Sequence, residues 1–153
     1  MKKRITAFVC AVVCAIGLTG CGGAKELDIN SAAQQLMSAD IFDENLMEVK
    51  AATTEKRLNL SSEDIESCVS YAGTKAVVDE IVIVKAVSAD AAANVKKAFD
   101  EHIATQKKSY SSYRPDEVPK LDSAVELAEG NYVVLVVSKD GEKAEKIVKD
   151  CMK

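Results

Sequence analysis

Apolar side chains recur at the three- and four-residue spacing of an amphipathic helix in three parts of the chain. Helices are therefore expected over residues 29–39, from about residue 89 to about residue 109, and from Gly141 to about Asp150. Asp28 precedes the first helix, and Ser88 or Asp90 opens the second. Because Ser and Asp oxygens accept hydrogen bonds from the free amides of a first helical turn, these residues are predicted to be N-caps.

Four other segments have the β-branched composition that is typical of strands. They are residues 65–71, 77–87, 123–128 and 132–138. Gly73 separates the first two and Gly130 the last two, so each pair is predicted to form an antiparallel hairpin. The last segment is almost continuous Val and Leu, which indicates a central strand with both faces covered.

Two further stretches show little regular pattern. Over residues 40–62 only a short turn of helix through Leu58 is expected, and Pro115 and Pro119 bound a single turn at 116–122. The resulting order of elements is α-ββα-ββα. It predicts an α+β fold in which helices pack on an antiparallel sheet of about four strands.

The beginning of the chain has the pattern of an export signal. Residues 2–4 are basic, and residues 5–18 are nearly all apolar but too short to span a membrane comfortably. A Leu-Thr-Gly-Cys segment ending at Cys21 then places small residues directly before a thiol, which is the lipobox pattern. The sequence therefore predicts a signal peptide over residues 1–20, cleavage between Gly20 and Cys21, and attachment of acyl chains to Cys21.

Two alternatives for this segment remain open, an ordinary secretory signal and a short membrane anchor that is never cut. The lipoprotein interpretation places the protein on the outer, extracytoplasmic face of the cell membrane, because two acyl chains hold a protein stably at a bilayer. Residues 21–27 would then be a lipidated tether, and residues 28–153 would form a single α+β domain close to the membrane.

Composition and charge narrow the classes of function. The chain has 153 residues, of which 48% are hydrophobic and 29% charged, as expected for one globular domain. Without residues 1–20, 17 basic and 24 acidic residues remain, a net charge of −7. Since such a domain repels phosphate backbones, no nucleic-acid partner is expected. A single His and the absence of Trp disfavour a His-based metal site and a Trp-lined sugar cleft.

Two cysteines follow the proposed lipidation site. Outside the cytoplasm, Cys68 and Cys151 could form a disulfide. They also match the alternative of two unrelated small apolar side chains, and the sequence pattern does not decide how far apart they lie.

A group of aromatic and basic residues follows the long helix. Tyr110, Tyr113 and Arg114 lie close together in sequence, and with Tyr132 they could line a patch that recognises a partner. The alternative is a helix end that packs on the sheet and leaves its hydroxyl groups in water.

Candidate acid–base residues are few. Asp79 and Glu80 begin a strand that is otherwise Val and Ile, and strand alternation sends their carboxylates to opposite faces. One of them is expected to pair with Lys85 or with a Lys at 107–108, as a structural charge at a strand end. His102 lies beside the apolar stripe of the long helix and is expected to be half packed and half wet.

Motifs for catalysis and for cofactors are absent from the sequence. It contains no Gly-rich phosphate loop, no His-Glu-x-x-His, no Cys-x-x-Cys, no Gly-x-Ser-x-Gly and no calcium loop, so neither a metal nor a cofactor is expected. The leading hypothesis is a non-enzymatic module that binds an envelope protein or peptide. The alternatives are an envelope enzyme or enzyme accessory that uses acidic residues such as Glu80, and a small-solute-binding subunit of a transporter.

Three segments resemble a family of small bacterial lipoproteins known as domain of unknown function family 4358, which is common in anaerobic Gram-positive bacteria. They are AVVDEIVIVK at 76–85, QKKSYSSYRP at 106–115 and EGNYVVLVVS at 129–138. The resemblance extends over roughly residues 28–150. It implies an architecture and a lipid-anchored location but no reaction, and Cys68 and Cys151 do not look like features of the family.

Overall fold

The computed structural model describes residues 26–153. The predicted signal peptide, the cleavage between Gly20 and Cys21 and the lipidation of Cys21 lie outside the described residues. Within residues 26–153, no helix is both long and apolar enough to cross a membrane.

A five-stranded antiparallel sheet forms the middle layer, with the strand order β1-β2-β3-β5-β4. Its strands are β1 (Met47–Glu48), β2 (Ile65–Ala72), β3 (Glu80–Ala86), β4 (Val125–Glu129) and β5 (Tyr132–Val137). The two longest hairpins, β2–β3 and β4–β5, are those that the sequence predicts. They join through β3 and β5, which makes these two strands central.

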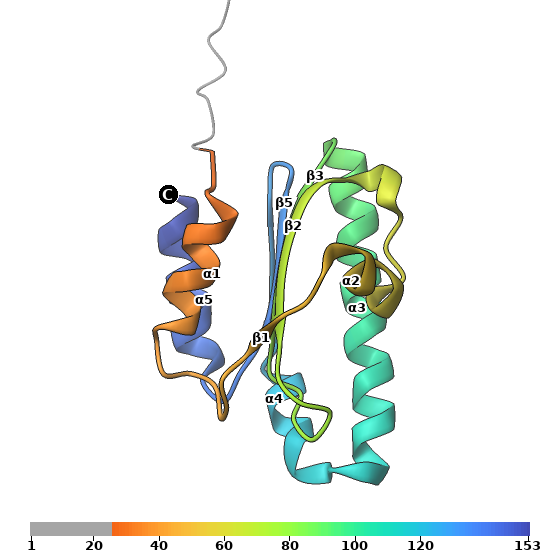
Figure 1. Cartoon of the computed structure of the whole chain (residues 1–153), viewed down its shortest axis with the longest axis vertical. Helices are drawn as coiled ribbons and strands as arrows, with labels where there is room; N and C mark the ends of the chain where they lie inside the picture. Colours follow the sequence, from red (N-terminus) through yellow and green to blue (C-terminus); the bar gives the residue numbers. More distant parts are fainter. Residues whose placement is uncertain (1–25) are drawn as a thin grey trace, which may run out of the picture.

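Helices cover both faces of this sheet, so that the fold has three layers (Figure 1). The helices are α1 (Ile29–Met37), α2 (Ala51–Leu58), α3 (Ala89–Tyr113), α4 (Val118–Asp122) and α5 (Gly141–Met152), with short 3₁₀ turns at Ser62–Asp64 and Pro115–Glu117. Figure 1 shows α1 and α5 together on one face and α2 and α3 on the other.

Strand alternation divides the core between the two faces. Ile81 and Ile83 of β3 pack in the cluster under α1 and α5, whereas Val82 and Val84 pack in the cluster under α3. All four side chains are 0% exposed. Each such side chain contributes about 1.5–3 kcal/mol through burial, which explains why β3 and β5 are almost wholly apolar. The one acidic side chain of β3, Glu80, belongs to the α3 face by the same alternation.

The predicted helix starts are confirmed. The Asp28 carboxylate accepts hydrogen bonds from the amides of Asn30 and Ser31, and the Ser88 hydroxyl accepts one from the Ala91 amide at 3.1 Å. Each cap satisfies amides that have no partner within the helix.

The α+β class is confirmed, and the strand count is corrected from about four to five. The additional strand, β1, has two residues and therefore leaves no periodic signal. The helix before β2 begins at Ala51 and is longer than the predicted turn. β3 begins at Glu80 rather than Val77, because residues 73–79 form a loop that the Gly73 amide closes on the Asp79 carbonyl at 2.9 Å.

Of the two alternatives for Cys68 and Cys151, the possible disulfide is not formed in the structure. Cys68 packs against the core under α3, and Cys151 packs against the core under α1 and α5. The sheet lies between the two side chains, whereas a disulfide requires Cα atoms less than about 7 Å apart.

Candidate functional site

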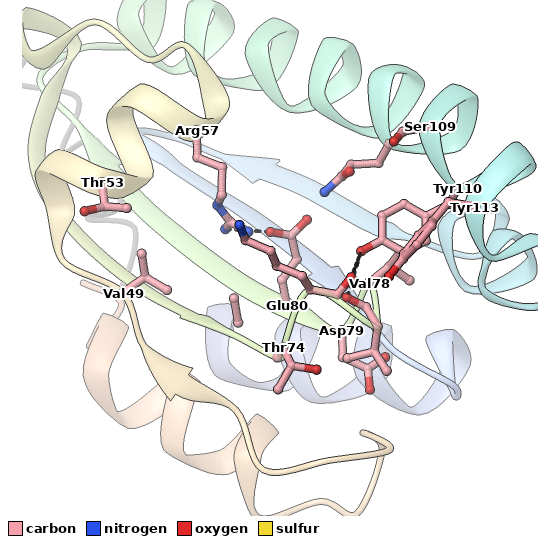
Figure 2. A pocket seen from close by; sticks show the side chains of 15 residues that line it. Val49, Thr53, Arg57, Thr74, Val78, Asp79, Glu80, Ser109, Tyr110 and Tyr113 are labelled. Atoms are coloured by element: carbon pink, nitrogen blue, oxygen red, sulfur yellow. Dashed lines mark hydrogen bonds and ion pairs between the residues drawn. The ribbon is translucent and has the colours of Figure 1, made fainter.

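A pocket of about 520 Å³ opens on the α3 face of the sheet. Its walls come from α2, the C-terminal half of α3, the start of β3 and the 73–79 loop (Figure 2). This size is within the range of small-molecule sites in proteins. The pocket therefore has the dimensions of a ligand site, and the chemistry of its side chains decides what it can hold.

Glu80 lies at the base of this pocket, with its side chain 2% exposed. Oε1 is 2.7 Å from His102 Nε2, and Oε2 is 2.7 Å from Arg57 Nη2. β3 supplies the carboxylate, the middle of α3 supplies the imidazole and α2 supplies the guanidinium. Three elements that are distant in sequence therefore meet at one buried charge.

The electrostatics of Glu80 favour its ionised form. Burial by itself raises the pKa of a carboxyl group, but the hydrogen bond and charge of His102 and the charge of Arg57 outweigh it and hold the pKa of Glu80 below its ordinary value. Among the described residues, Oε2 accepts no aligned hydrogen bond, so the contact with Arg57 is an ion pair without hydrogen-bond geometry. A carboxyl group that stays ionised is poorly suited to act as a general acid at neutral pH.

Asp79 points away from Glu80, as strand alternation predicts (Figure 2). Its Oδ1 lies 3.1 Å from Lys120 Nζ, and its Oδ2 accepts a hydrogen bond from the Asp43 amide at 2.8 Å. Burial, opposed by these contacts, raises the pKa of Asp79. The two neighbouring carboxylates therefore belong to separate charge clusters and do not form a catalytic pair.

Lys120 is the centre of the second cluster and is itself buried. Its ammonium group contacts Asp43 and Asp79 and lies 3.0 Å from Glu117 Oε2. Burial opposes the charged form, but the contacts of the ammonium group with these three accepting carboxylates raise the pKa of Lys120. Glu117 Oε2 also accepts a hydrogen bond from the Val78 amide at 3.0 Å, so this cluster fastens the 73–79 loop to α4.

Tyr110 and Arg114 fasten the same loop from the end of α3. The Tyr110 hydroxyl donates to the carbonyls of Lys75 and Val77 at 3.1 and 3.2 Å, and Arg114 Nη1 donates to the Ala76 carbonyl at 3.0 Å. Tyr110 is consequently 8% exposed, and its role is to shape the pocket.

Tyr113 is the exposed member of this group. It is 65% exposed, and its ring lies edge-on to that of Tyr110 with the centroids 6.0 Å apart. An aromatic face at the mouth of a pocket gives rigid contact area for a ligand.

Tyr132 does not join the other three residues of the predicted recognition patch. It pairs with Lys85 at the end of β3 opposite Glu80, and Lys85 Nζ lies 6.0 Å from the centre of its ring. The patch over Tyr110, Tyr113, Arg114 and Tyr132 is therefore not one surface, because the β4–β5 hairpin turn lies at the far end of the sheet (Figure 1).

The charge partners also differ from those expected at Asp79 and Glu80. Lys85 pairs with Glu26 and Glu66, each at 2.9 Å, and Lys107 pairs with Asp122 at 3.0 Å. His102 is 8% exposed rather than half wet, because it is the partner of Glu80.

Sequence reasoning missed Arg57 and Lys120. A carboxylate within an apolar strand must have a buried partner, and this rule indicates the single His of the chain as one candidate. No local pattern indicates Arg57 or Lys120, since each reaches its partner across the fold.

No group of three or more His, Cys, Asp or Glu side chains suited to a metal ion occurs within residues 26–153. The described side chains of the pocket thus offer hydrogen-bond donors, cations and apolar surface.

A family model described as Domain of unknown function (DUF4358) matches residues 39–138. This range contains β1 to β5, α2 to α4 and every side chain of the pocket described above. No curated protein and no solved structure matches the chain.

Proposed function

The chain belongs to the DUF4358 family, and from the geometry of its site we propose that it is a lipid-anchored, non-enzymatic binding module on the outer face of the cell membrane. It would bind an envelope component in the pocket beside Glu80. The observation that carries this proposal is the position of the pocket relative to the start of the domain.

The N-terminal end of the domain and the pocket lie at opposite ends of β3. Glu26 Oε1 is 2.9 Å from the Nζ of Lys85, near the end of β3, whereas Glu80 begins the strand at the pocket. A seven-residue strand is about 20 Å long. Acyl chains on Cys21, a few residues before Glu26, would therefore hold the pocket on the end of the domain that faces away from the lipid.

The chemistry of the pocket supports binding rather than catalysis. Glu80 is ion-paired with Arg57 through Oε2 and contacts His102 through Oε1, its lowered pKa favours the ionised form, and the Asp79 carboxylate is bound to Lys120. Proton transfer by an enzyme of the acidic type would need a carboxyl group that is exposed to substrate and has a raised pKa.

Site-specific photo-cross-linking in intact cells tests this proposal. A benzophenone amino acid in place of Tyr113, at the pocket, is compared with the same group in place of Val87, which is 52% exposed near the other end of the sheet. The proposal expects a discrete adduct from position 113 and none of the same mass from position 87. Equal labelling from both positions, or none from position 113, would contradict it.

Lipid anchoring is tested separately by fractionating cells that express the Cys21→Ala variant. The wild-type chain is expected in the membrane fraction and to incorporate labelled palmitate, and the variant is expected to incorporate none and to remain unprocessed at residue 21. Palmitate incorporation that persists in the variant would refute lipidation at this thiol.

A further inference from the structure

The pocket presents positive charge and hydrogen-bond donors that the protein does not use itself. Arg57 contacts Glu80 through Nη2, and its guanidinium makes no other ion pair or hydrogen bond with the described residues. A guanidinium has five N–H donors in a fixed plane, so most of those of Arg57 are free to meet a ligand. Lys75, an exposed lining residue from the 73–79 loop, has no side-chain ion pair within residues 26–153.

The acidic groups of the pocket are already neutralised. Glu80 is held between His102 and Arg57, and Asp79 is ion-paired with Lys120 on the other side of the strand. An incoming anion therefore meets the remaining N–H donors of Arg57 and the unpaired cation Lys75, and no unpaired carboxylate from the lining. The positive charge of Lys75 is opposite in sign to the net charge of the chain, which is −4 at pH 7.

The walls of the pocket add apolar surface next to these cations. Tyr113 offers an exposed ring at the mouth, and Val49 and Val77 are half buried in the lining. Figure 2 shows Arg57 and the Tyr110–Tyr113 pair on facing sides of the pocket. A ligand that reaches both therefore needs an anionic end and an apolar or aromatic part.

We propose that this pocket binds a carboxylate ligand that carries an apolar or aromatic group close to the carboxylate. The carboxylate lies on Arg57 and Lys75, and the apolar part lies on Tyr113 and Val77. This inference rests on the proposed binding function and specifies its ligand class. Two sources offer the same chemistry, a free organic acid and the C-terminal carboxylate of a peptide.

Matched acids and amides distinguish the ligand class and its source. Phenylacetate and phenylacetamide represent the free acid, and N-acetyl-Ala-Ala-Phe with a free or an amidated C-terminus represents the peptide. Binding to the full chain in detergent micelles is followed in ¹H–¹⁵N NMR spectra. Because the amides partition into micelles at least as well as the acids, a preference for the acid does not come from the detergent.

The expected result is that acids bind about tenfold more tightly than their amides, with shifts at the amides of residues 73–78 and 109–113. A tighter peptide acid would assign the source to a chain terminus, and a tighter phenylacetate would assign it to a free acid. Affinity is expected to fall with added salt, since an exposed cation pair is screened.

Three variants distinguish binding to the cations of the pocket from attraction by the overall charge of the protein. Lys75→Gln is expected to weaken acid binding about threefold to tenfold, and Arg57→Lys is expected to weaken it at least as much because the planar fork is lost while a cation remains beside Glu80. Lys56→Gln, on an exposed neighbouring position of α2, is the matched control and is expected to leave affinity within about twofold. Thermal unfolding of each variant shows that the fold is intact.

Two outcomes overturn the inference. Equal affinity for acids and amides would leave a binding pocket but remove the carboxylate preference. A loss of acid binding in Lys56→Gln equal to that in Lys75→Gln would show attraction by overall charge. Neither outcome affects the cross-linking result at position 113, so the failure of this inference is distinguishable from the failure of the proposed function.

Discussion

Replacing Lys120 by Gln is expected to lower the free energy of unfolding by about 3 kcal/mol. The substitution removes the ammonium group that lies 3.1 Å from Asp79 and 3.0 Å from Glu117, whose side chains are 0% and 6% exposed. Leaving buried carboxylates without their counter-charge costs about 3–5 kcal/mol. The lower end of this range is expected, because Arg114 remains 3.7 Å from Glu117.

Urea unfolding of the full chain in detergent micelles measures this loss, and Lys139→Gln is the matched control. Lys139 approaches the same cluster from solvent, with Nζ 3.8 Å from Asp43 Oδ1 and its side chain 40% exposed. Its replacement is expected to cost less than about 1 kcal/mol, as for other surface ion pairs. Comparing the two Lys→Gln changes isolates the effect of burial.

The pH dependence of the free energy of unfolding gives a second test of the Lys120→Gln variant. Burial already raises the pKa of Asp79, and without Lys120 its carboxyl group gains more from protonation, so the stability deficit of the variant is expected to shrink as the pH falls from 7 to about 3. The reasoning is refuted if Lys120→Gln loses no more stability than Lys139→Gln at pH 7, or if its deficit is independent of pH.

Three further predictions follow from other parts of the fold. The folded-state pKa of Glu80 lies below the ordinary value of 4.5, so the stability that its ionised form contributes is present above pH 4.5 and is expected to be lost as the pH falls through the folded-state pKa. In a pH series of urea titrations, Glu80→Gln is expected to flatten this part of the wild-type stability profile. Burial raises the pKa of Cys68 to about 11, so its alkylation by iodoacetamide at pH 8 is expected to be slow in the folded chain and fast in urea. Peptide mass spectrometry follows the reaction, and equal rates in the two conditions would contradict the burial of this thiol. Gly73→Ala is expected to lower the melting temperature, because the added Cβ would lie 2.5 Å from Glu44 Oε1 and 2.6 Å from Val77 Cγ2. Gly130→Asn, at a φ of 57° with open space around it, is expected to be tolerated. Similar melting temperatures for both variants would show that the 73–79 loop can relax.

The layers and helix starts of this fold follow from local sequence, because they depend on periodicity and on capping. Val82 and Ile83 alternate between two apolar faces, and Ser88 caps the helix that it precedes. β1 was not predictable, since two residues carry no period and its pairing with Tyr71 and Ala72 is made far along the chain.

The pocket was predictable only in part. The sequence indicates that Glu80 and Asp79 separate, and it singles out Tyr110 and Tyr113 at the end of α3. It could not assign the buried role to Tyr110, because that role depends on carbonyl groups 33 and 35 residues earlier in the chain. The approach of Arg57 to Glu80 likewise depends on how α2 packs, which no local pattern encodes.

Earlier residues hold the 73–79 loop only at its two ends, where Asp43 and Glu44 contact Asp79 and Thr74, whereas the contacts to its middle come from later parts of the chain. The Val78 amide donates to the carboxylate of Glu117, 39 residues later in the chain. The Ala76 carbonyl accepts from the guanidinium of Arg114, 38 residues later. In a chain that leaves a ribosome or a translocation pore with its N-terminus first, the β2–β3 hairpin can form before these later contacts exist. A polypeptide that stops before Glu117 would therefore lack the contacts that Glu117 and Lys120 make with Val78 and Asp79, and this side of the pocket would be incompletely supported.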